Sequence, residues 1–108
     1  MRTPAQRRNL MILRDEILPG IAEGKLDMRR LFNRCGTPSC LLGHAQASGR
    51  FPFLTRDVYG IDGEEDTFGL EAMPEWKHIF GGNLPNDPTW LAANITDLLC
   101  EEGDSNAT

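Results

Sequence analysis

Two cysteines and a histidine in the short stretch CGTPSCLLGH have the side chains best suited to metal or thiol chemistry. Cys40 and His44 are four residues apart, so on a helix they project from the same face, and Cys35 could fold back as a third zinc ligand. A structural zinc site needs a fourth ligand. Neither Cys100 nor His78 supplies it, because each faces away from the apolar stripe of its expected helix. A zinc-stabilised module built on Cys35, Cys40 and His44 is therefore a minor alternative.

Redox and nucleophilic chemistry are both disfavoured for these thiols. The sequence has three cysteines, an odd number, and no segment with the pattern of an export signal. We therefore expect a reducing, cytoplasmic environment in which Cys35 and Cys40 stay unpaired. A cysteine at a helix N-terminus has a lowered pKa, but no acidic residue is placed to orient His44 as a base. We predict no enzymatic activity and no cofactor.

The same stretch has features of a phosphate-binding helix start. Backbone N–H groups and side-chain hydroxyls gather there, with arginines just upstream, and helix N-termini attract anions. The complete GxxxxGK[ST] spacing of a phosphate loop is absent. The second functional hypothesis is thus a small-ligand binder that holds a phosphate-bearing molecule around Thr37. Its candidate anion-binding residues are Gly36, Thr37, Ser39, Arg30 and Arg34.

The simplest interpretation of this stretch is a capped, buried helix. Thr37 followed by Pro38 is a typical N-cap and first helical residue. The residues from there to Gly49 are small or apolar on nearly every side, which predicts a central helix. Gly43 in mid-helix costs about 1 kcal/mol relative to alanine, so its presence predicts close approach of another backbone.

Two further helices share this capping signature. Thr3–Pro4 precedes an apolar stripe in residues 5–18, and Asp87–Pro88 precedes another in a closing helix that runs to about Glu101. Each stripe covers one face, which indicates packing against a common core. The expected core residues are Leu10, Met11, Leu13, Ile17 and Leu18 in the first helix, and Trp90, Leu91, Ile95, Leu98 and Leu99 in the last.

The connecting segments have weaker signals. Residues 26–32 suit either a short helix or an irregular segment, and residues 49–69, rich in glycine, indicate a loop. The sequence therefore predicts an all-α fold. It would be a single small domain, residues 1–100, of four or five short helices around a central buried helix starting near Thr37, followed by an acidic mobile tail, 101–108. The residues expected to pin the long loop to the core are Phe51, Phe53 and Leu54.

Charge is unevenly distributed along the chain. Residues 1–56 contain ten Lys and Arg against four Asp and Glu, a net charge of +6, whereas residues 57–108 contain one Lys against twelve acids, a net charge of −11. Packing of the two halves against each other would neutralise part of this charge. The net charge of −5 for the whole chain disfavours direct binding to nucleic acid.

The densest acidic run, DGEEDTFG, contains ligand types that calcium prefers. The EF-hand spacing is absent, however, because Gly69 stands where the bidentate glutamate is required. We expect a solvated acidic loop, whose field would attract a basic protein surface. The candidate partner-binding residues are Asp57, Asp62, Glu64, Glu65, Asp66, Glu71 and Glu75.

The motif CGTPSCLLGHA, together with FGLEAMPEWKHIFGGNLP and the closing DPTWLAANITDLL, resembles a widespread family of small uncharacterised bacterial and bacteriophage proteins. The family pattern is Cys-Gly-Thr-x-x-Cys-x-x-Gly-x-Ala, and the likeness extends over residues 26–100. In this family the position of His44 is often tryptophan, which implies a packing role for this residue rather than a ligand or base. The matching residues are Cys35, Gly36, Thr37, Cys40, Gly43 and Ala45.

This resemblance implies a bacterial or bacteriophage origin and an accessory role, but no reaction. Together with the charge pattern, it makes a small non-enzymatic interaction or regulatory protein the leading hypothesis. Such a protein would act in the host cytoplasm on a host protein machine, as an inhibitor or anti-defence factor, and its partner would be a protein with a basic surface. No membrane association is expected, because the longest apolar run, LMILR, is far shorter than the ~20 residues of a membrane span. The sequence indicates no oligomeric state.

Overall fold

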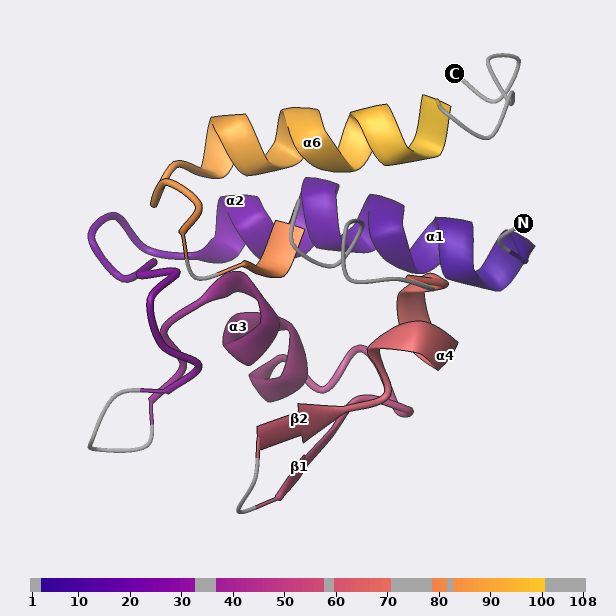
Figure 1. Ribbon diagram of the computed structural model, residues 1–108, viewed down its shortest axis with the longest axis horizontal. Coiled ribbons are helices and arrows are strands. Elements are labelled where there is room, and N and C mark those ends of the chain that lie inside the picture. Colours follow the sequence, from indigo (N-terminus) through magenta and orange to yellow (C-terminus); the bar gives the residue numbers. More distant parts are fainter. Residues whose placement is uncertain (1–2, 33–36, 58–59, 71–78, 82, 101–108) are drawn as a thin grey trace.

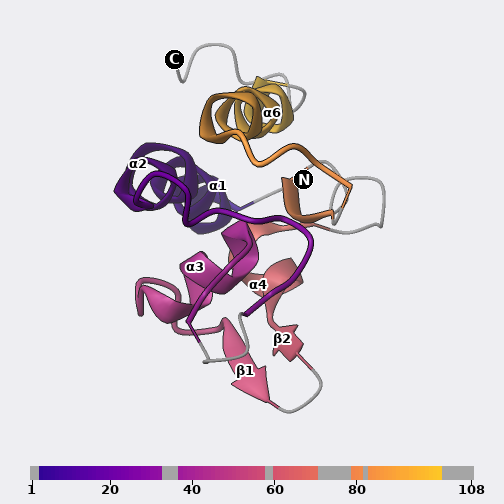
Figure 2. The ribbon, with the colours of Figure 1, turned by 90° about the vertical axis from the view of Figure 1, so that its left-hand side faces the viewer.

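The computed structural model describes residues 3–32, 37–57, 60–70, 79–81 and 83–100. Its helices form three tiers in Figures 1 and 2, with α6 above a long N-terminal helix and with α3 and α4 below it, and a two-stranded sheet lies beneath the lowest tier. In chain order, the elements are α1 (Pro4–Ile12), the π-helix η1 (Leu13–Ile17), α2 (Leu18–Gly20), α3 (Leu41–Ala47), β1 (Thr55–Asp57), β2 (Gly60–Asp62), α4 (Glu64–Phe68) and α6 (Pro88–Cys100).

The N-terminal helix, which α1, η1 and α2 form without a break, begins where the sequence predicts. Thr3 is the N-cap and Pro4 the first helical residue. The Gln6 backbone N–H donates to Thr3 Oγ1 at 3.1 Å, and the Thr3 N–H donates to Gln6 Oε1 at 2.9 Å. This capping box satisfies two backbone donors that a helix start otherwise leaves unpaired.

Helix α6 runs antiparallel to the N-terminal helix (Figure 1) and also begins as predicted. Asp87 Oδ1 accepts from the backbone N–H groups of Thr89 at 3.0 Å and Trp90 at 3.4 Å. Two arginines join the helices. Arg7 Nη1 donates to the Leu99 carbonyl at 3.2 Å, and Arg14, which pairs with Asp15, donates to the Thr96 hydroxyl at 3.2 Å. The arginine stems cross the apolar interface while their head groups stay bonded.

One core connects the three tiers. Phe68 lies fully buried at its centre, with its ring centroid 5.1 Å from that of Phe51 and 5.7 Å from that of Phe80, in tilted or edge-on geometries that aromatic pairs prefer. Trp90 is an exception to the predicted core, because 40% of it is exposed, and Met11 is only half-buried. The predicted core residues that are confirmed are Leu10, Leu13, Ile17, Leu18, Leu91, Ile95, Leu98 and Leu99.

The prediction of an all-α fold is wrong, because the chain contains an antiparallel β-hairpin and is mixed α/β. Thr55 of β1 pairs with Asp62 of β2, and Asp57 pairs with Gly60. Two residues separate the strands in the sequence, which is the spacing of a tight hairpin. Within β2 only Ile61 is buried, which is the alternation of a half-buried strand. Because glycines surround this short alternating segment, its sequence indicated a loop instead of a strand.

The prediction that the central helix starts near Thr37 is also wrong, because α3 begins at Leu41 with Cys40 as its N-cap. The helix itself is packed on most sides, as expected, with four of its seven residues buried. The prediction for Gly43 is confirmed: a Cβ atom there would lie 2.2 Å from the carbonyl oxygen of Leu31. Only glycine allows the two backbones to approach this closely.

The backbone ahead of α3 is extended because it bonds to an earlier segment of the chain. The Ser39 N–H donates to the Leu31 carbonyl at 2.9 Å, the Asp27 N–H donates to the Ser39 carbonyl at 2.9 Å, and Pro38 forms a β-bridge with Phe32. These contacts are not local, so the Thr–Pro signature alone could not reveal them. They also show that residues 26–32 form an irregular segment, one of the two forms that the sequence left open.

Candidate protein-interaction site

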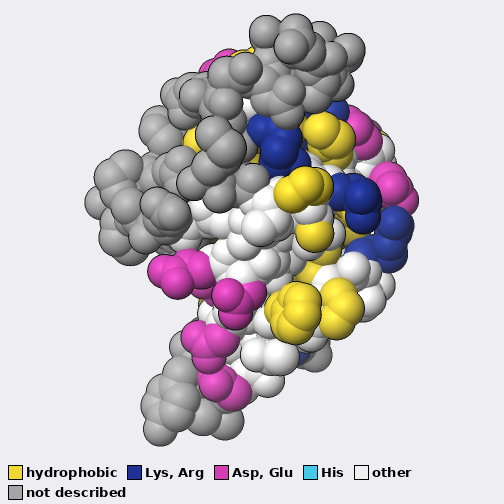
Figure 3. Space-filling view, turned by 90° about the vertical axis from the view of Figure 1, so that its right-hand side faces the viewer, with side chains coloured by type: hydrophobic (Ala, Val, Ile, Leu, Met, Phe, Trp, Pro, Cys, Tyr) yellow, Lys and Arg dark blue, Asp and Glu magenta, His cyan; other side chains and the backbone are white. Residues whose placement is uncertain are grey.

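Acidic side chains gather at one end of the molecule, where β2 leads into α4. Asp62 is the last residue of β2, and Glu64, Glu65 and Asp66 form the first turn of α4. Figure 3 shows a row of acidic side chains on this face. Asp57, at the other end of the hairpin, is exposed. The remaining predicted partner-binding residues, Glu71 and Glu75, lie outside the described residues, as does the predicted tail, 101–108.

The acidic run is a helix, not the solvated loop that its composition predicts. Gly63 and Gly69 flank it with φ angles of 101° and 71°, a conformation that favours glycine. The Thr67 N–H donates to the Gly63 carbonyl at 2.9 Å, and the Gly69 N–H donates to the Glu65 carbonyl at 2.8 Å. The buried ring of Phe68 fixes this short helix to the core. Acids in a first helical turn are also favoured by the helix dipole.

Helix α1 supports α4 from the other side. Gln6 Nε2 lies 3.3 Å from the carbonyl oxygens of both Glu65 and Asp66, and Asn9 Nδ2 donates to the Thr67 carbonyl at 2.9 Å. The Asp66 and Thr67 carbonyls are among those that a helix of five residues leaves unpaired at its end, and Gln6 adds a second donor to the Glu65 carbonyl, which already accepts from Gly69. The acidic turn is therefore held in place by side chains about sixty residues away in the sequence.

The carboxylate of Glu64 is half-buried and lacks a hydrogen-bond donor on one oxygen. Its Oε1 atom is buried and has no hydrogen-bond partner among the residues that the structure describes. Burial raises the pKa of Glu64 above its usual value, and the negative charges of Asp62 and Glu65 raise it further. The ionised acids thus repel one another. A positive charge bound next to them would offset this electrostatic repulsion.

The ion pairs elsewhere do not neutralise these acids. Those within the described residues each join two members of the basic N-terminal half; they are Arg14–Asp15, Asp27–Arg29 and Glu16–Arg50. The two halves of the chain meet through the core and through hydrogen bonds to uncharged acceptors, such as those of Asn9 with the Thr67 carbonyl and of Arg7 with the Leu99 carbonyl. Within the described part of the chain, no ion pair is formed by Asp62, Glu64, Glu65 or Asp66.

An exposed aromatic side chain lies beside the acidic turn. Phe53 is 68% exposed, whereas Phe51 and Leu54 are buried on either side of it. The prediction that all three pin the loop to the core is therefore confirmed for two of them and wrong for Phe53. The Leu54 N–H donates to the Phe51 carbonyl at 3.0 Å and closes a turn. A Cβ atom on Gly63 would lie 1.9 Å from the Phe53 carbonyl oxygen, so this turn packs directly against the residue that precedes α4.

The structure does not bring Cys40 and His44 together as a metal site. Burial raises the pKa of the Cys40 thiol, which accepts the Gly43 N–H at 3.5 Å and stays protonated at neutral pH. His44 Nε2 lies 3.1 Å from the Lys25 carbonyl, and it must donate there because a carbonyl only accepts. No group of three or more His, Cys, Asp and Glu among the described residues is placed to hold a metal. The third predicted ligand, Cys35, lies outside these residues.

The residues predicted for phosphate binding do not form a helix-start site. Ser39 is only 1% exposed, and its hydroxyl donates to the Asp27 carbonyl at 3.1 Å. Thr37 and Arg30 are exposed, but Thr37 precedes α3 by several residues of extended chain, so its neighbouring N–H groups do not open a helix. The other two predicted residues, Gly36 and Arg34, lie outside the described residues.

A groove of about 650 Å³ lies between the end of α2 and the start of α6. Two of its polar groups are already engaged: Asp27 accepts from Arg29, which lowers the pKa of Asp27 to about 2, and Asn86 Oδ1 accepts the Met28 N–H at 2.7 Å. Neither group is therefore poised for acid–base chemistry. The other lining residues are Leu18, Pro19, Ile21, Ala22, Glu23, Gly24, Leu26 and Pro88.

Comparisons with known protein families, with characterised proteins and with solved structures each find no match. The family resemblance of the cysteine motif therefore stays a prediction. In the described part of the chain, no helix combines the length and the apolar character that a membrane span requires. A functional proposal for this protein rests on its own geometry and charge.

Sequence reasoning missed Phe53 as a surface residue and α4 as a helix. Two local signals were present for them. In FPFL, proline and phenylalanine occupy the two central positions of a turn, which point away from the core when the outer residues are buried. In GEEDTFG, paired glycines bracket a short acidic segment, and a glycine just past a helix end is a common C-terminal signal.

Proposed function

We propose that this protein is a small, non-enzymatic interaction protein that binds a basic protein surface through an acidic face, defined as Asp62, Glu64, Glu65 and Asp66. The observation that supports this most directly is the half-buried Glu64 carboxylate, which lies among like charges with Oε1 unpaired. A lysine or arginine from a partner, placed over the exposed acids beside Glu64, would supply the missing counter-charge.

The way in which α4 is held also favours binding. Gln6 and Asn9 fix the helix from one side, and the buried Phe68 fixes it from another. A surface that is already ordered loses less conformational entropy on association than a mobile loop does. The acidic face is therefore already ordered in the free protein. Asp57 lies at its periphery.

The biological role that we propose is regulatory. By covering a basic surface of a larger host protein machine, the protein would act as an inhibitor or anti-defence factor in the cytoplasm, in line with the family that its cysteine motif resembles. The partner is a protein rather than nucleic acid, because the phosphate backbone would be repelled by the same carboxylates.

The test compares two doubly substituted proteins with the same net charge. E65K/D66K reverses two exposed acids of the acidic face, and E23K/D97K reverses two exposed acids elsewhere. The partner is first captured from an extract of the source cells, identified by mass spectrometry and purified. Its affinity for each protein is then measured at about 0.01 M and about 1 M salt, where the Debye lengths are about 30 Å and 3 Å.

We expect wild type to bind tightly at low salt and far more weakly at high salt. E65K/D66K should lose at least about tenfold in affinity at low salt, which corresponds to the removal of one good charge contact. E23K/D97K should bind as wild type does. Equal affinities for wild type and E65K/D66K at low salt would refute the proposed function, as would equal losses for the two charge-reversed proteins.

A further inference from the structure

We propose that Phe53 and the acidic face form one docking surface, and that this surface takes a partner segment in which an apolar side chain is flanked by Lys or Arg. This inference rests on the proposed function and specifies the chemistry of the partner at the same site. The observation that supports it is the exposed Phe53 ring, which lies next to carboxylates that form no ion pair within the described residues.

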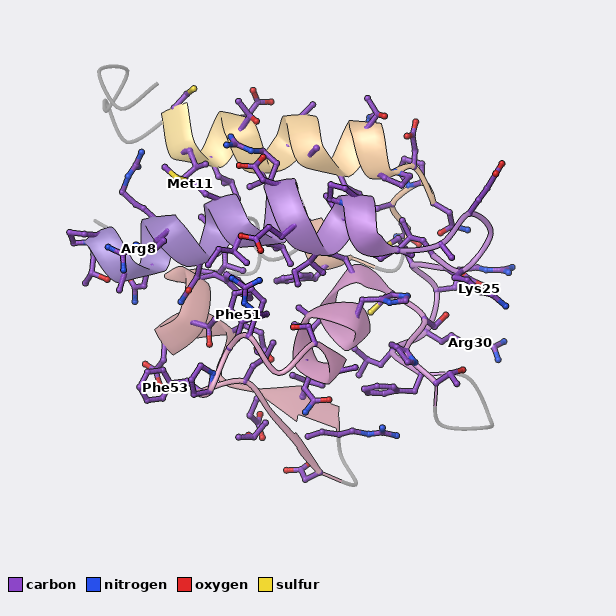
Figure 4. The ribbon with its side chains drawn as sticks, turned by 180° about the vertical axis from the view of Figure 1, so that it is seen from behind. Arg8, Met11, Lys25, Arg30, Phe51 and Phe53 are labelled. Atoms are coloured by element: carbon purple, nitrogen blue, oxygen red, sulfur yellow. The ribbon has the colours of Figure 1, made fainter. Side chains whose placement is uncertain are left out.

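The hairpin register places Phe53 beside the acidic turn. Thr55 pairs with Asp62, so the chain two residues before Thr55 reaches the start of α4. The contact at Gly63, where a Cβ atom would lie 1.9 Å from the Phe53 carbonyl oxygen, confirms this proximity. In Figure 4 the Phe53 side chain points outward at the end of the molecule where α4 lies, and in Figure 3 hydrophobic side chains adjoin the acidic row.

The backbone that carries the ring is also held in a fixed position. The turn from Phe51 to Leu54 is anchored by a buried side chain at each end and closed by a backbone hydrogen bond of 3.0 Å. Single exposed apolar residues are common on protein surfaces. Phe53 differs from most of them because its backbone is fixed against the element that presents the acids. Trp90, the other large exposed hydrophobic residue among those described, adjoins Asp87, whose carboxylate is engaged in capping α6.

This combination fits one kind of partner segment. Aromatic residues are enriched in the cores of protein interfaces, where they bury large apolar areas, and charged groups lie at the rim. An apolar side chain of the partner would cover the Phe53 ring while flanking Lys or Arg residues pair with the exposed acids Asp62, Glu65 and Asp66. The guanidinium of a partner arginine can lie over the ring as well, as that of Arg56 does at Phe32, where its Cζ atom lies 3.5 Å from the ring centroid.

The test uses two synthetic peptides of equal positive charge. One has a leucine between pairs of lysines, and the other has serine in place of that leucine. Wild type should bind the leucine peptide about tenfold more tightly than the serine peptide at low salt. F53S should bind both peptides with the affinity that wild type has for the serine peptide. W90S, which removes the other exposed aromatic ring, should keep the tenfold preference.

The outcomes separate this inference from the proposed function. If wild type binds both peptides equally and F53S binds as wild type does, the docking role of Phe53 is refuted while the acidic face stands. If neither peptide binds wild type at low salt, the proposed function fails together with it. Chemical-shift changes in wild type offer a readout that needs no variant: the leucine peptide should shift the signals of Phe53 and α4, and shifts confined to other elements would overturn the inference.

Discussion

Two buried hydroxyl groups differ in what they bond. Ser39 and Thr67 are each 1% exposed. The Ser39 hydroxyl donates to the Asp27 carbonyl at 3.1 Å, whereas Thr67 Oγ1 has no hydrogen-bond partner within the described part of the chain. A buried polar group without a partner costs about 1–3 kcal/mol, while a satisfied one contributes about 1 kcal/mol. At the scale of single residues, the two sites should therefore respond to hydroxyl removal with opposite signs.

We predict that T67V raises the free energy of unfolding by about 1 kcal/mol and that S39A lowers it by about the same amount. The change in T67V replaces a hydroxyl by a methyl group of nearly the same shape, so it leaves no cavity. Urea denaturation monitored by circular dichroism measures both values, provided that the variants keep the wild-type slope of unfolding free energy against urea concentration. A destabilised T67V would contradict the prediction and would indicate a water molecule bonded to Thr67.

Among the elements, α3 depends on a glycine for its packing. We predict that G43A destabilises the protein by about 1–3 kcal/mol, although alanine is the better helix former, because its Cβ would meet the Leu31 carbonyl oxygen at 2.2 Å. Gly20 is the matched control, since it ends α2 and a methyl group added to it would have nothing within 4 Å. G20A should be neutral or stabilising by up to about 1 kcal/mol. Thermal unfolding of the two variants side by side decides the point.

Helix α4 depends on Gln6, which also caps α1. We predict that Q6E keeps the capping box, where glutamate is equally suitable, but loses the amide donors to the Glu65 and Asp66 carbonyls. Q6A should lose both functions. Hydrogen exchange should then be faster in α4 alone for Q6E, and faster in both α4 and the first turn of α1 for Q6A. Unchanged exchange in α4 for Q6E would show that Gln6 does not hold it.

The elements also show which parts of the fold could be predicted from sequence. The starts at Thr3 and Asp87 were predictable because the bonds that cap them lie within three residues. Thr37 has the same signature, but its neighbour Ser39 bonds to Leu31 instead, and no local pattern reveals that partner. The hairpin and α4 were missed because elements of three to five residues are too short to show a period.

The candidate site was predictable to a similar degree. Composition alone indicated an acidic contact surface, and this stays a prediction. Composition could not show that Glu64 is half-buried or that Phe53 lies beside it, since both facts depend on the contact of the Phe53 turn with Gly63. Cys40 is buried and its pKa is raised by burial, a feature that the sequence could not show; the expectation that its thiol does no chemistry stays a prediction.

For the molecule as a whole, two carboxylates give opposite dependences of stability on pH. The pKa of Asp27 is lowered to about 2 from 3.8 by Arg29, so its ion pair stabilises the fold above pH 3.8 and is lost as the pH falls towards 2. The pKa of Glu64 is raised above 4.5, mainly by burial. The folded state therefore favours protonated Glu64, and ionisation of this group costs stability as the pH rises above 4.5.

We predict that E64Q melts at a higher temperature than wild type at pH 7. This difference should disappear well below pH 4.5, where the Glu64 carboxyl of wild type is protonated in both the folded and the unfolded state. The same variant should bind the basic partner more weakly. Greater stability with weaker binding is the signature of a residue kept for function. Melting curves across this pH range, with D27N as a control of opposite sign, measure the effect; E64Q less stable than wild type at pH 7 would contradict it.

The contact at Gly63 has a consequence for engineering. It brings Phe53 and the acids of α4 together within residues 53–66, so the whole docking surface is a continuous epitope rather than one assembled from distant parts of the chain. Such an epitope can be transplanted as one loop insertion. The graft would have to extend to Gly69, and the recipient scaffold would need an apolar site for Phe68 and side-chain amides in place of Gln6 and Asn9, because these contacts hold the helix.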